Sequence, residues 1–146
     1  MEFERTECAC AECVACCKRQ PGPLAPGDLA EIERFLNLPR DDVRALFVAS
    51  RGTLVQDRRT GARRWIGSIT PARKANGTCV FLDDATERCL IHEVAPFGCA
   101  VFDTHMSAAE SAPAASWLAL SMESPLYQAQ RAGLAPAKPN GGHGGN

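Results

Sequence analysis

The chain of 146 residues lacks several features that mark common functional classes. No apolar run approaches the ~20 residues that span a bilayer, and the polar, acidic start has neither the basic residues nor the apolar stretch of a secretory signal. Its 16 basic and 17 acidic residues nearly cancel, so no overall field gathers nucleic acid or anionic lipid. We therefore expect a cytoplasmic protein that binds neither membranes nor nucleic acid.

The sequence also lacks an evident catalytic set. It contains no phosphate-binding loop, no nucleophile elbow, and no acid–base pair with a defined spacing. We find no internal repeat. The length and the hydrophobic content of 45% are typical of one globular domain. The composition therefore indicates a small domain whose chemistry, if any, lies elsewhere.

Cysteine is the residue that the chain has in excess. Five of the 8 cysteines stand within ten residues, and the other three follow much later, with nine residues between neighbours. Thiolates that lie so close repel one another and oxidise readily unless something shares their charge. Soft thiolate ligands select zinc, copper(I) or iron–sulfur clusters. A metal centre is therefore the simplest explanation for both groups, which are Cys8, Cys10, Cys13, Cys16 and Cys17, and then Cys79, Cys89 and Cys99.

Four disulfides are the alternative explanation for an even number of cysteines. The expected compartment argues against them, because cytoplasmic thiols are normally kept reduced. In addition, the adjacent Cys16 and Cys17 could pair with each other only through a strained ring. We therefore favour metal ligation.

The spacing of the first cysteines is compatible with two kinds of centre. Cys10, Cys13 and Cys16 have the spacing of three ligands in a [4Fe–4S] run, but the usual fourth cysteine, followed by proline, is missing. A distal cysteine would then complete the cluster, or one position would stay open. Alternatively, Cys10 and Cys13 form half of a tetrahedral zinc site that two distal cysteines complete. Either centre joins segments more than sixty residues apart, so metal binding should be coupled to folding.

Between the two cysteine groups, the sequence predicts two helices and a hairpin. Asp28 is a suitable N-cap for a helix over residues 29–36. A second helix is predicted to begin near residue 41, with an apolar face that includes Val43 and Phe47, and to end at Gly52. Residues 53–69 are typical of a β-hairpin with an arginine-rich turn, which we interpret as solvated.

The remaining chain carries the distal cysteines in short apolar pieces separated by turns. A closing helix is predicted over residues 116–131, interrupted at Pro125, after an Ala/Ser-rich linker. Residues 133–146 are predicted to form a disordered tail. We thus expect a small, mostly helical α+β domain over residues 1–132, with one β-hairpin and with cysteine-bearing loops stapled by a metal centre.

The complete cysteine pattern resembles that of a known family. The motifs are Cys10-x2-Cys13-x2-Cys16-Cys17, Cys79-Val-Phe-Leu, Arg88-Cys89-Leu-Ile-His and Pro96-x2-Cys99. Together they are similar to the zinc- or iron-chelating CxxCxxCC family of bacteria and archaea, over about residues 10–103. The family often has arginines around the last cysteine, where this chain has Ala95 and Ala100.

The resemblance implies a protein that chelates zinc or iron, the iron either as an ion or as a [4Fe–4S] cluster, in one or two centres. Flagellin lysine N-methylases contain a similar cluster, so an iron–sulfur oxidoreductase or a methyl-transfer-associated enzyme with an open coordination position is the alternative. Without an evident catalytic set we favour binding and leave enzyme activity open. The ligands that the resemblance implies are Cys10, Cys13, Cys16, Cys17, Cys79, Cys89 and Cys99.

A few further side chains are candidates for lesser roles. Cys8 lies outside the motif and is either an auxiliary ligand or a peripheral thiol. His92 stands where the resembling family has tyrosine, so a packed aromatic role competes with ligation. His105 lies six residues beyond Cys99 and is a second candidate imidazole ligand, which Asp103 could orient.

Overall fold

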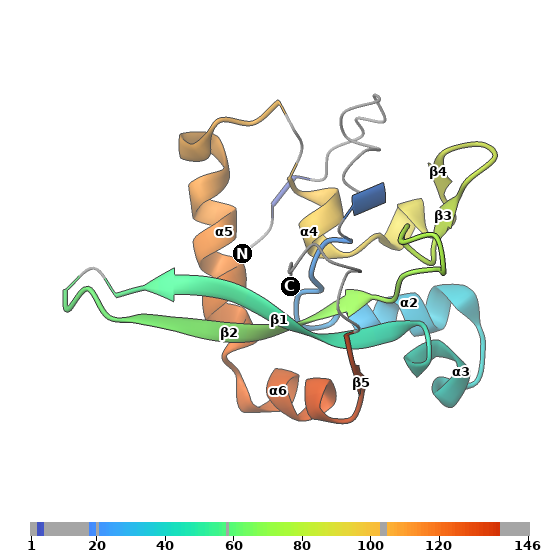
Figure 1. The fold of residues 1–146 in the computed structure, drawn as a ribbon, viewed down its shortest axis with the longest axis horizontal. Coiled ribbons are helices and arrows are strands. Elements are labelled where there is room, and N and C mark those ends of the chain that lie inside the picture. Colours follow the sequence, from blue (N-terminus) through green and yellow to red (C-terminus); the bar gives the residue numbers. More distant parts are fainter. Residues whose placement is uncertain (1–2, 5–17, 20, 58, 103–104, 138–146) are drawn as a thin grey trace.

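The computed structural model describes residues 3–4, 18–19, 21–57, 59–102 and 105–137. A long antiparallel hairpin crosses the molecule, and helices pack around one part of it while its tip extends beyond them (Figure 1). Among the described residues, helices account for more of the chain than strands do. The predicted α+β class is therefore confirmed.

The first predicted helix is confirmed as α2 (Asp28–Leu36), which buries Leu29 and Ile32. Its cap differs from the prediction, because Gly27, with φ 92°, is the N-cap and Asp28 is the first helical residue. The Asp28 carboxylate instead accepts hydrogen bonds from the backbone N–H groups of Ala25 and Phe97, both at 2.8 Å. It thereby ties the segment before α2 to a distant part of the chain.

The second predicted helix is too long. The helix α3 spans only Arg40–Arg44, and strand β1 (Phe47–Gln56) begins three residues later. A short apolar run fits a helix or a strand equally well by period alone, and here antiparallel pairing with β2 (Arg63–Pro71) decides. Gly52 lies at a bulge inside β1 with φ 91°, where a Cβ would collide with the carbonyl oxygen of Ile66.

The Ala/Ser-rich segment predicted as a linker is helical. Helix α5 spans Ala108–Met122, and a capping box between Ser107 and Glu110 begins it. Helix α6 follows as Pro125–Ala132, with Ser124 as its N-cap and Pro125 in its first turn. The predicted break at Pro125 thus corresponds to the start of a new helix.

Residues 133–137, which the sequence analysis assigns to the tail, run beside the sheet. Strand β5 (Ala135–Pro136) pairs in parallel with β1 and gives the strand order β2-β1-β5. Residues 138–146, the rest of the predicted tail, lie outside the described residues.

The core lies between the sheet and the helices. Tyr127 of α6 is among its largest fully buried side chains. Its hydroxyl donates to the carbonyl oxygen of Leu24 at 2.7 Å and accepts from the N–H of Ile69 at 2.9 Å. It thus joins α6, β2 and the segment before α2. No helix in the described part of the chain is both long and apolar enough to cross a bilayer.

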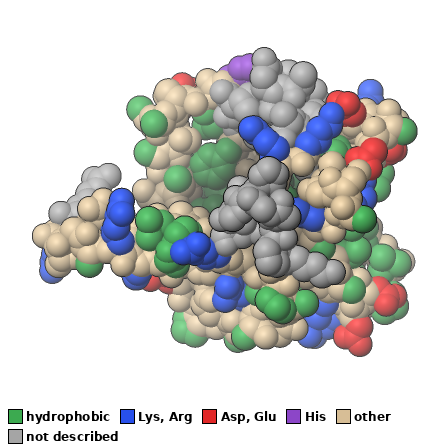
Figure 2. Space-filling model, in the orientation of Figure 1, with side chains coloured by type: hydrophobic (Ala, Val, Ile, Leu, Met, Phe, Trp, Pro, Cys, Tyr) green, Lys and Arg blue, Asp and Glu red, His purple; other side chains and the backbone are tan. Residues whose placement is uncertain are grey.

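Charge is unevenly distributed over the surface. Lys and Arg side chains and hydrophobic side chains lie next to one another along the extended end of the hairpin (Figure 2). Acidic side chains appear mainly toward the opposite end of the view, where α2, α3 and the small hairpin β3–β4 (Leu82–Asp83 and Arg88–Cys89) lie.

Candidate metal centre

The three distal cysteines lie in one irregular region between β2 and α5. Cys79 precedes β3 and is buried, whereas Cys89 in β4 and Cys99 in α4 (Phe97–Ala100) are half-buried. Strands β3 and β4 form a second, short hairpin beside the one predicted. No disulfide links these three cysteines to one another.

A network of polar side chains holds the loop that carries Cys79. Lys74 donates to the carbonyl oxygen of Leu82 at 2.6 Å and to the Asp84 carboxylate at 2.7 Å. Asn76 and Thr78 also donate to Asp84, at 3.2 and 3.3 Å. The hydrogen bond from Lys74 is the largest cause that keeps the pKa of Asp84 below its usual value. The loop is therefore closed by a carboxylate that stays ionised.

Pairing within the short hairpin fixes Cys89 relative to that loop. Cys89 lies opposite Leu82, and the N–H of Leu90 donates to the carbonyl oxygen of Phe81 at 2.8 Å. Glu87 closes the turn with φ 57°. Burial raises the pKa of the Cys89 thiol, and a hydrogen bond from the backbone of Ile91 offsets part of that rise. Since metals bind thiolates, ligation here would release a proton.

We define residues 8–17 as the cysteine head. Cys99 contacts the segment that follows this head. The N–H of Gly22 donates to the Cys99 Sγ at 3.2 Å, and the N–H of Gly98 donates to the carbonyl oxygen of Pro23 at 2.8 Å. The approach requires glycine, because a Cβ on Gly22 would lie 2.5 Å from the Gly98 carbonyl carbon and 2.8 Å from the Cys99 Sγ. Chain entering from the head is thus packed directly against Cys99.

Lys18 makes a second contact between the same two regions. It directly follows Cys17, and its Nζ lies 2.9 Å from the Glu87 carboxylate, two residues before Cys89. Both side chains are about half exposed, so this ion pair reports position more than stability.

The other flank of the head is anchored by aromatic packing. The ring centroid of Phe3 lies 5.7 Å from that of Phe97 and 5.7 Å from that of Trp117. Phe97 also contacts Phe102 and Trp117, at 5.9 and 5.0 Å. Because Phe97 is two residues before Cys99, the chain reaches the distal region both before and after the head.

The head itself, with Cys8, Cys10, Cys13, Cys16 and Cys17, lies outside the described residues, as do Asp103 and His143. Within the described ranges, no three His, Cys, Asp or Glu side chains form a group that could hold a metal ion. The distal cysteines therefore do not make a site by themselves. His92, which begins the 3-10 helix η1 (His92–Val94), and His105 are both exposed. Neither belongs to a group of described side chains that could hold a metal ion.

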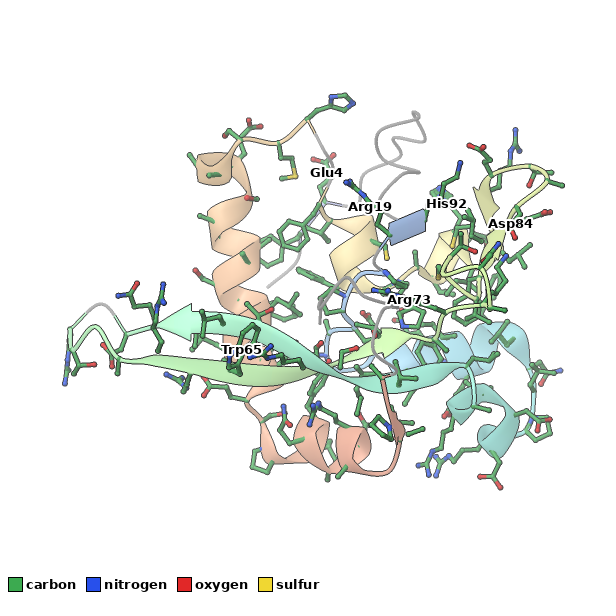
Figure 3. All side chains as sticks on the ribbon, viewed as in Figure 1. Glu4, Arg19, Trp65, Arg73, Asp84 and His92 are labelled. Atoms are coloured by element: carbon green, nitrogen blue, oxygen red, sulfur yellow. The ribbon has the colours of Figure 1, made fainter. Side chains whose placement is uncertain are left out.

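Arg19, which follows Lys18, lies on the same side of the long hairpin as His92 and Asp84 (Figure 3). The sequence pattern indicates the cysteines but none of the contacts that join the flanks of the head to the distal region. The spacing of Gly22 and Lys18 from their partners is 77 and 69 residues, and no local pattern signals contacts of that range.

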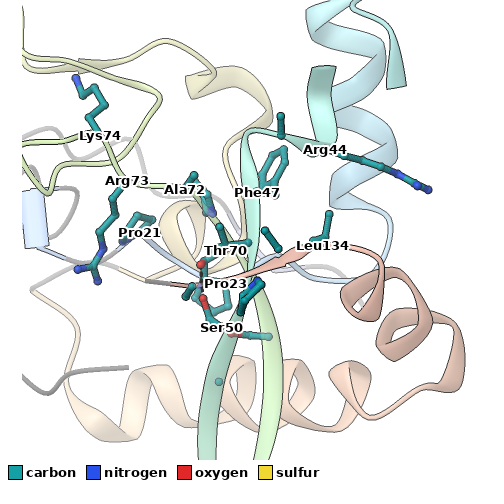
Figure 4. Close-up of a pocket in the computed structure, with 18 of the residues that line it drawn as sticks. Pro21, Pro23, Arg44, Phe47, Ser50, Thr70, Ala72, Arg73, Lys74 and Leu134 are labelled. Carbon is teal, nitrogen blue, oxygen red and sulfur yellow. Dashed lines mark hydrogen bonds between the residues drawn. The ribbon is translucent and has the colours of Figure 1, made fainter. Parts of the chain in front are cut away.

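A cavity of about 860 Å³ lies along the sheet (Figure 4). The hydroxyls of Ser50 and Thr70 share a 2.5 Å hydrogen bond at its wall. Arg44 points away from it in the close-up, and Lys74 is engaged by Asp84. None of its described lining residues is a cysteine, although Lys74 and Gly77 belong to the loop that carries Cys79.

Comparison with known proteins bears directly on the cysteine pattern. The pattern of the CxxCxxCC family, described as "Putative zinc- or iron-chelating domain", matches residues 9–119. The chain belongs to this family. The uncharacterized protein MJ0661 of Methanocaldococcus jannaschii is a relative of this CxxCxxCC protein, 30% identical over 90 residues, which cover 62% of the chain and 41% of the relative. The chain thus corresponds to about two fifths of that relative. No solved structure matches.

Proposed function

We propose that this CxxCxxCC protein binds zinc or iron in a centre shared between the cysteine head and the distal cysteines. One observation carries the proposal: both flanks of the head lie against the segments that hold Cys89 and Cys99. Phe3 packs on Phe97, Lys18 pairs with Glu87, and Gly22 donates to the Cys99 sulfur. We expect a loop closed at both ends in this way to bring its thiols toward the distal ones.

The donor chemistry fits such a centre. Thiolates suit zinc and iron–sulfur clusters, and the described residues alone do not assemble a site. The Cys99 sulfur already accepts a hydrogen bond from the N–H of Gly22, the kind of outer contact that orients ligands at metal centres. The residues that would hold the metal are Cys10, Cys13, Cys16, Cys17, Cys79, Cys89 and Cys99.

A bound ion would supply folding free energy by cross-linking segments that are distant in sequence. Four ligands close one site and leave three cysteines, so one closed site and one incompletely ligated site account for all seven. Family membership supports zinc or iron without choosing between them. We expect the protein to be primarily a binding protein.

The test is elemental analysis with an absorption spectrum on protein purified without oxygen. Colourless protein with stoichiometric zinc, or brown protein with stoichiometric iron, supports the proposal and identifies the metal. Cys13→Ser should lower the metal content and the stability of the domain, whereas Cys8→Ser, which changes a thiol outside the motif, serves as the matched control. Protein that binds neither metal, even after reconstitution of the reduced thiols, contradicts the proposal.

A further inference from the structure

The tip-proximal part of the β1–β2 hairpin forms an arm that extends past the helices (Figure 1). The ladder continues through the pairs Leu54↔Trp65 and Gln56↔Arg63 to a turn closed by Asp57. The Asp57 carboxylate accepts hydrogen bonds from the N–H of Arg59 at 2.7 Å. The arm is thus an ordered structure that the core does not bury.

The two faces of the arm differ. One face meets the end of α5, where Arg64 makes a bidentate ion pair with Glu123 at 2.7 and 2.8 Å. The other face carries Leu54 and Trp65, which are directly opposite each other and are 40% and 47% exposed. The Arg51 guanidinium lies 4.0 Å from the centroid of the Trp65 ring. We call the second face, Arg51, Leu54, Arg63 and Trp65, the arm face.

The arm is also strongly basic in a chain whose net charge is −1. Residues 51–66 contain five arginines and a single acidic residue, Asp57. Among the described side chains, Arg51, Arg59 and Arg63 take part in no ion pair, whereas Arg64 is satisfied by Glu123. The arm face therefore combines two exposed apolar side chains with guanidinium groups that form no ion pair with a described side chain.

We propose that the arm face binds an acidic segment of a partner protein, independently of the metal centre. Carboxylates of the partner would pair with Arg51 and Arg63, as Glu123 already does with Arg64 on the opposite face. An apolar partner side chain would cover Leu54 and Trp65. Tryptophan and arginine are the residues most often found at the energetic centre of protein interfaces.

Two observations favour an acidic protein over single-stranded nucleic acid. Arg51 already covers one face of the Trp65 ring, which reduces the surface on which a base could stack. Leu54 adds apolar area that phosphates and sugars do not match.

The experiment measures fluorescence anisotropy of a labelled twelve-residue peptide of alternating glutamate and leucine, titrated with metal-loaded full-length protein. We expect saturable binding that R51Q/R63Q weakens at least tenfold and that W65A also weakens. R34Q/R44Q removes the same charge from exposed positions on α2 and α3 and should bind as wild type does. Circular dichroism and metal content of each variant show that the fold and the centre are intact.

Two other probes decide between partner classes. A labelled twelve-nucleotide oligothymidylate should bind at least tenfold more weakly than the acidic peptide. Tighter binding of the oligonucleotide, or self-association that R51Q/R63Q abolishes, overturns the proposal in favour of nucleic acid or of a second copy of this chain. Equal peptide binding by R51Q/R63Q and R34Q/R44Q, or no peptide binding at all, also overturns it. Protein that takes up no metal but still binds the peptide would contradict only the proposed metal centre.

Discussion

Replacing Gly22 by alanine should directly disturb the contact between Cys99 and the segment that follows the head. The added Cβ would lie 2.5 Å from the Gly98 carbonyl carbon and 2.6 Å from the Cys99 nitrogen, both backbone atoms that cannot rotate away. Ordinary carbon contacts are ~3.5 Å or longer, so the two segments must separate by about 1 Å. That movement weakens the hydrogen bonds from Gly22 to the Cys99 Sγ and from Gly98 to Pro23.

The magnitude follows from these two effects. Overpacking costs about 1–3 kcal/mol, and each weakened hydrogen bond adds up to about 1 kcal/mol. We therefore expect G22A to lower the free energy of unfolding by about 2–4 kcal/mol in urea titrations of the metal-loaded protein. If Cys99 shares an ion with the head, displacement of its sulfur should also reduce metal affinity about 10–100-fold, as loss of supporting contacts does at other centres.

Gly133→Ala is the matched control. A Cβ at Gly133 would be 3.6 Å from the Gln130 carbonyl oxygen, an ordinary contact. G133A should therefore change neither the unfolding midpoint nor metal affinity measured against a chromophoric chelator. Wild-type stability in G22A would refute the packing argument. Reduced stability with unchanged metal affinity would refute the claim that this contact supports the centre.

Three further changes test other parts of the structure. Tyr127→Phe leaves a buried carbonyl and a buried N–H without their shared partner, so urea unfolding should show a loss of about 2–4 kcal/mol; a loss below 0.5 kcal/mol contradicts this. Because Lys74 lowers the pKa of Asp84, the ionised carboxylate should stabilise the Cys79 loop fully at pH values above the ordinary pKa of aspartate. This stabilisation should be lost as the pH falls through the lowered pKa of Asp84. Protection of the loop amides from hydrogen exchange should therefore fall over this pH range in wild type but not in Asp84→Asn. Identical pH profiles of the two proteins would disprove the role of the carboxylate. Titration with a weak chelator should release metal in two steps, and Cys17→Ser should abolish the weaker one; a single release step with unchanged stoichiometry argues against a second site.

The sequence predicted those elements whose signals are local. Helix α2 follows from apolar spacing, and the long hairpin from two strand-like runs around a polar turn. The prediction of the second helix was wrong because the apolar run around Phe47 suits a helix or a strand equally well. Its pairing with β2 decides for the strand. The first half of helix α5 was missed because its Ala/Ser composition suggested a linker, although Ser107 and Glu110 form a capping box that the sequence contained.

For the candidate metal centre too, local features could be predicted and long-range contacts could not. Cysteine spacing indicated metal binding and the family, since ligand types and short gaps are local features. The contacts that join the flanks of the head to the distal region involve residues such as Lys18 and Glu87, whose charges resemble those of many surface residues. The glycine crossing at Gly22 and Gly98 also leaves no distinctive pattern, because only the folded backbone shows why a side chain cannot fit.

The most direct test of the shared centre is NMR of protein loaded with ¹¹³Cd, whose scalar couplings identify the cysteines bound to each ion. We predict a cadmium resonance coupled to β-protons of at least one of Cys10, Cys13, Cys16 and Cys17 and also of Cys99 or Cys89. Coupling of the same resonance to the Gly22 amide proton, through its hydrogen bond to the Cys99 sulfur, would locate Cys99 on that ion. Cadmium resonances whose couplings all stay within the head, or all within the distal cysteines, would contradict a centre shared between them.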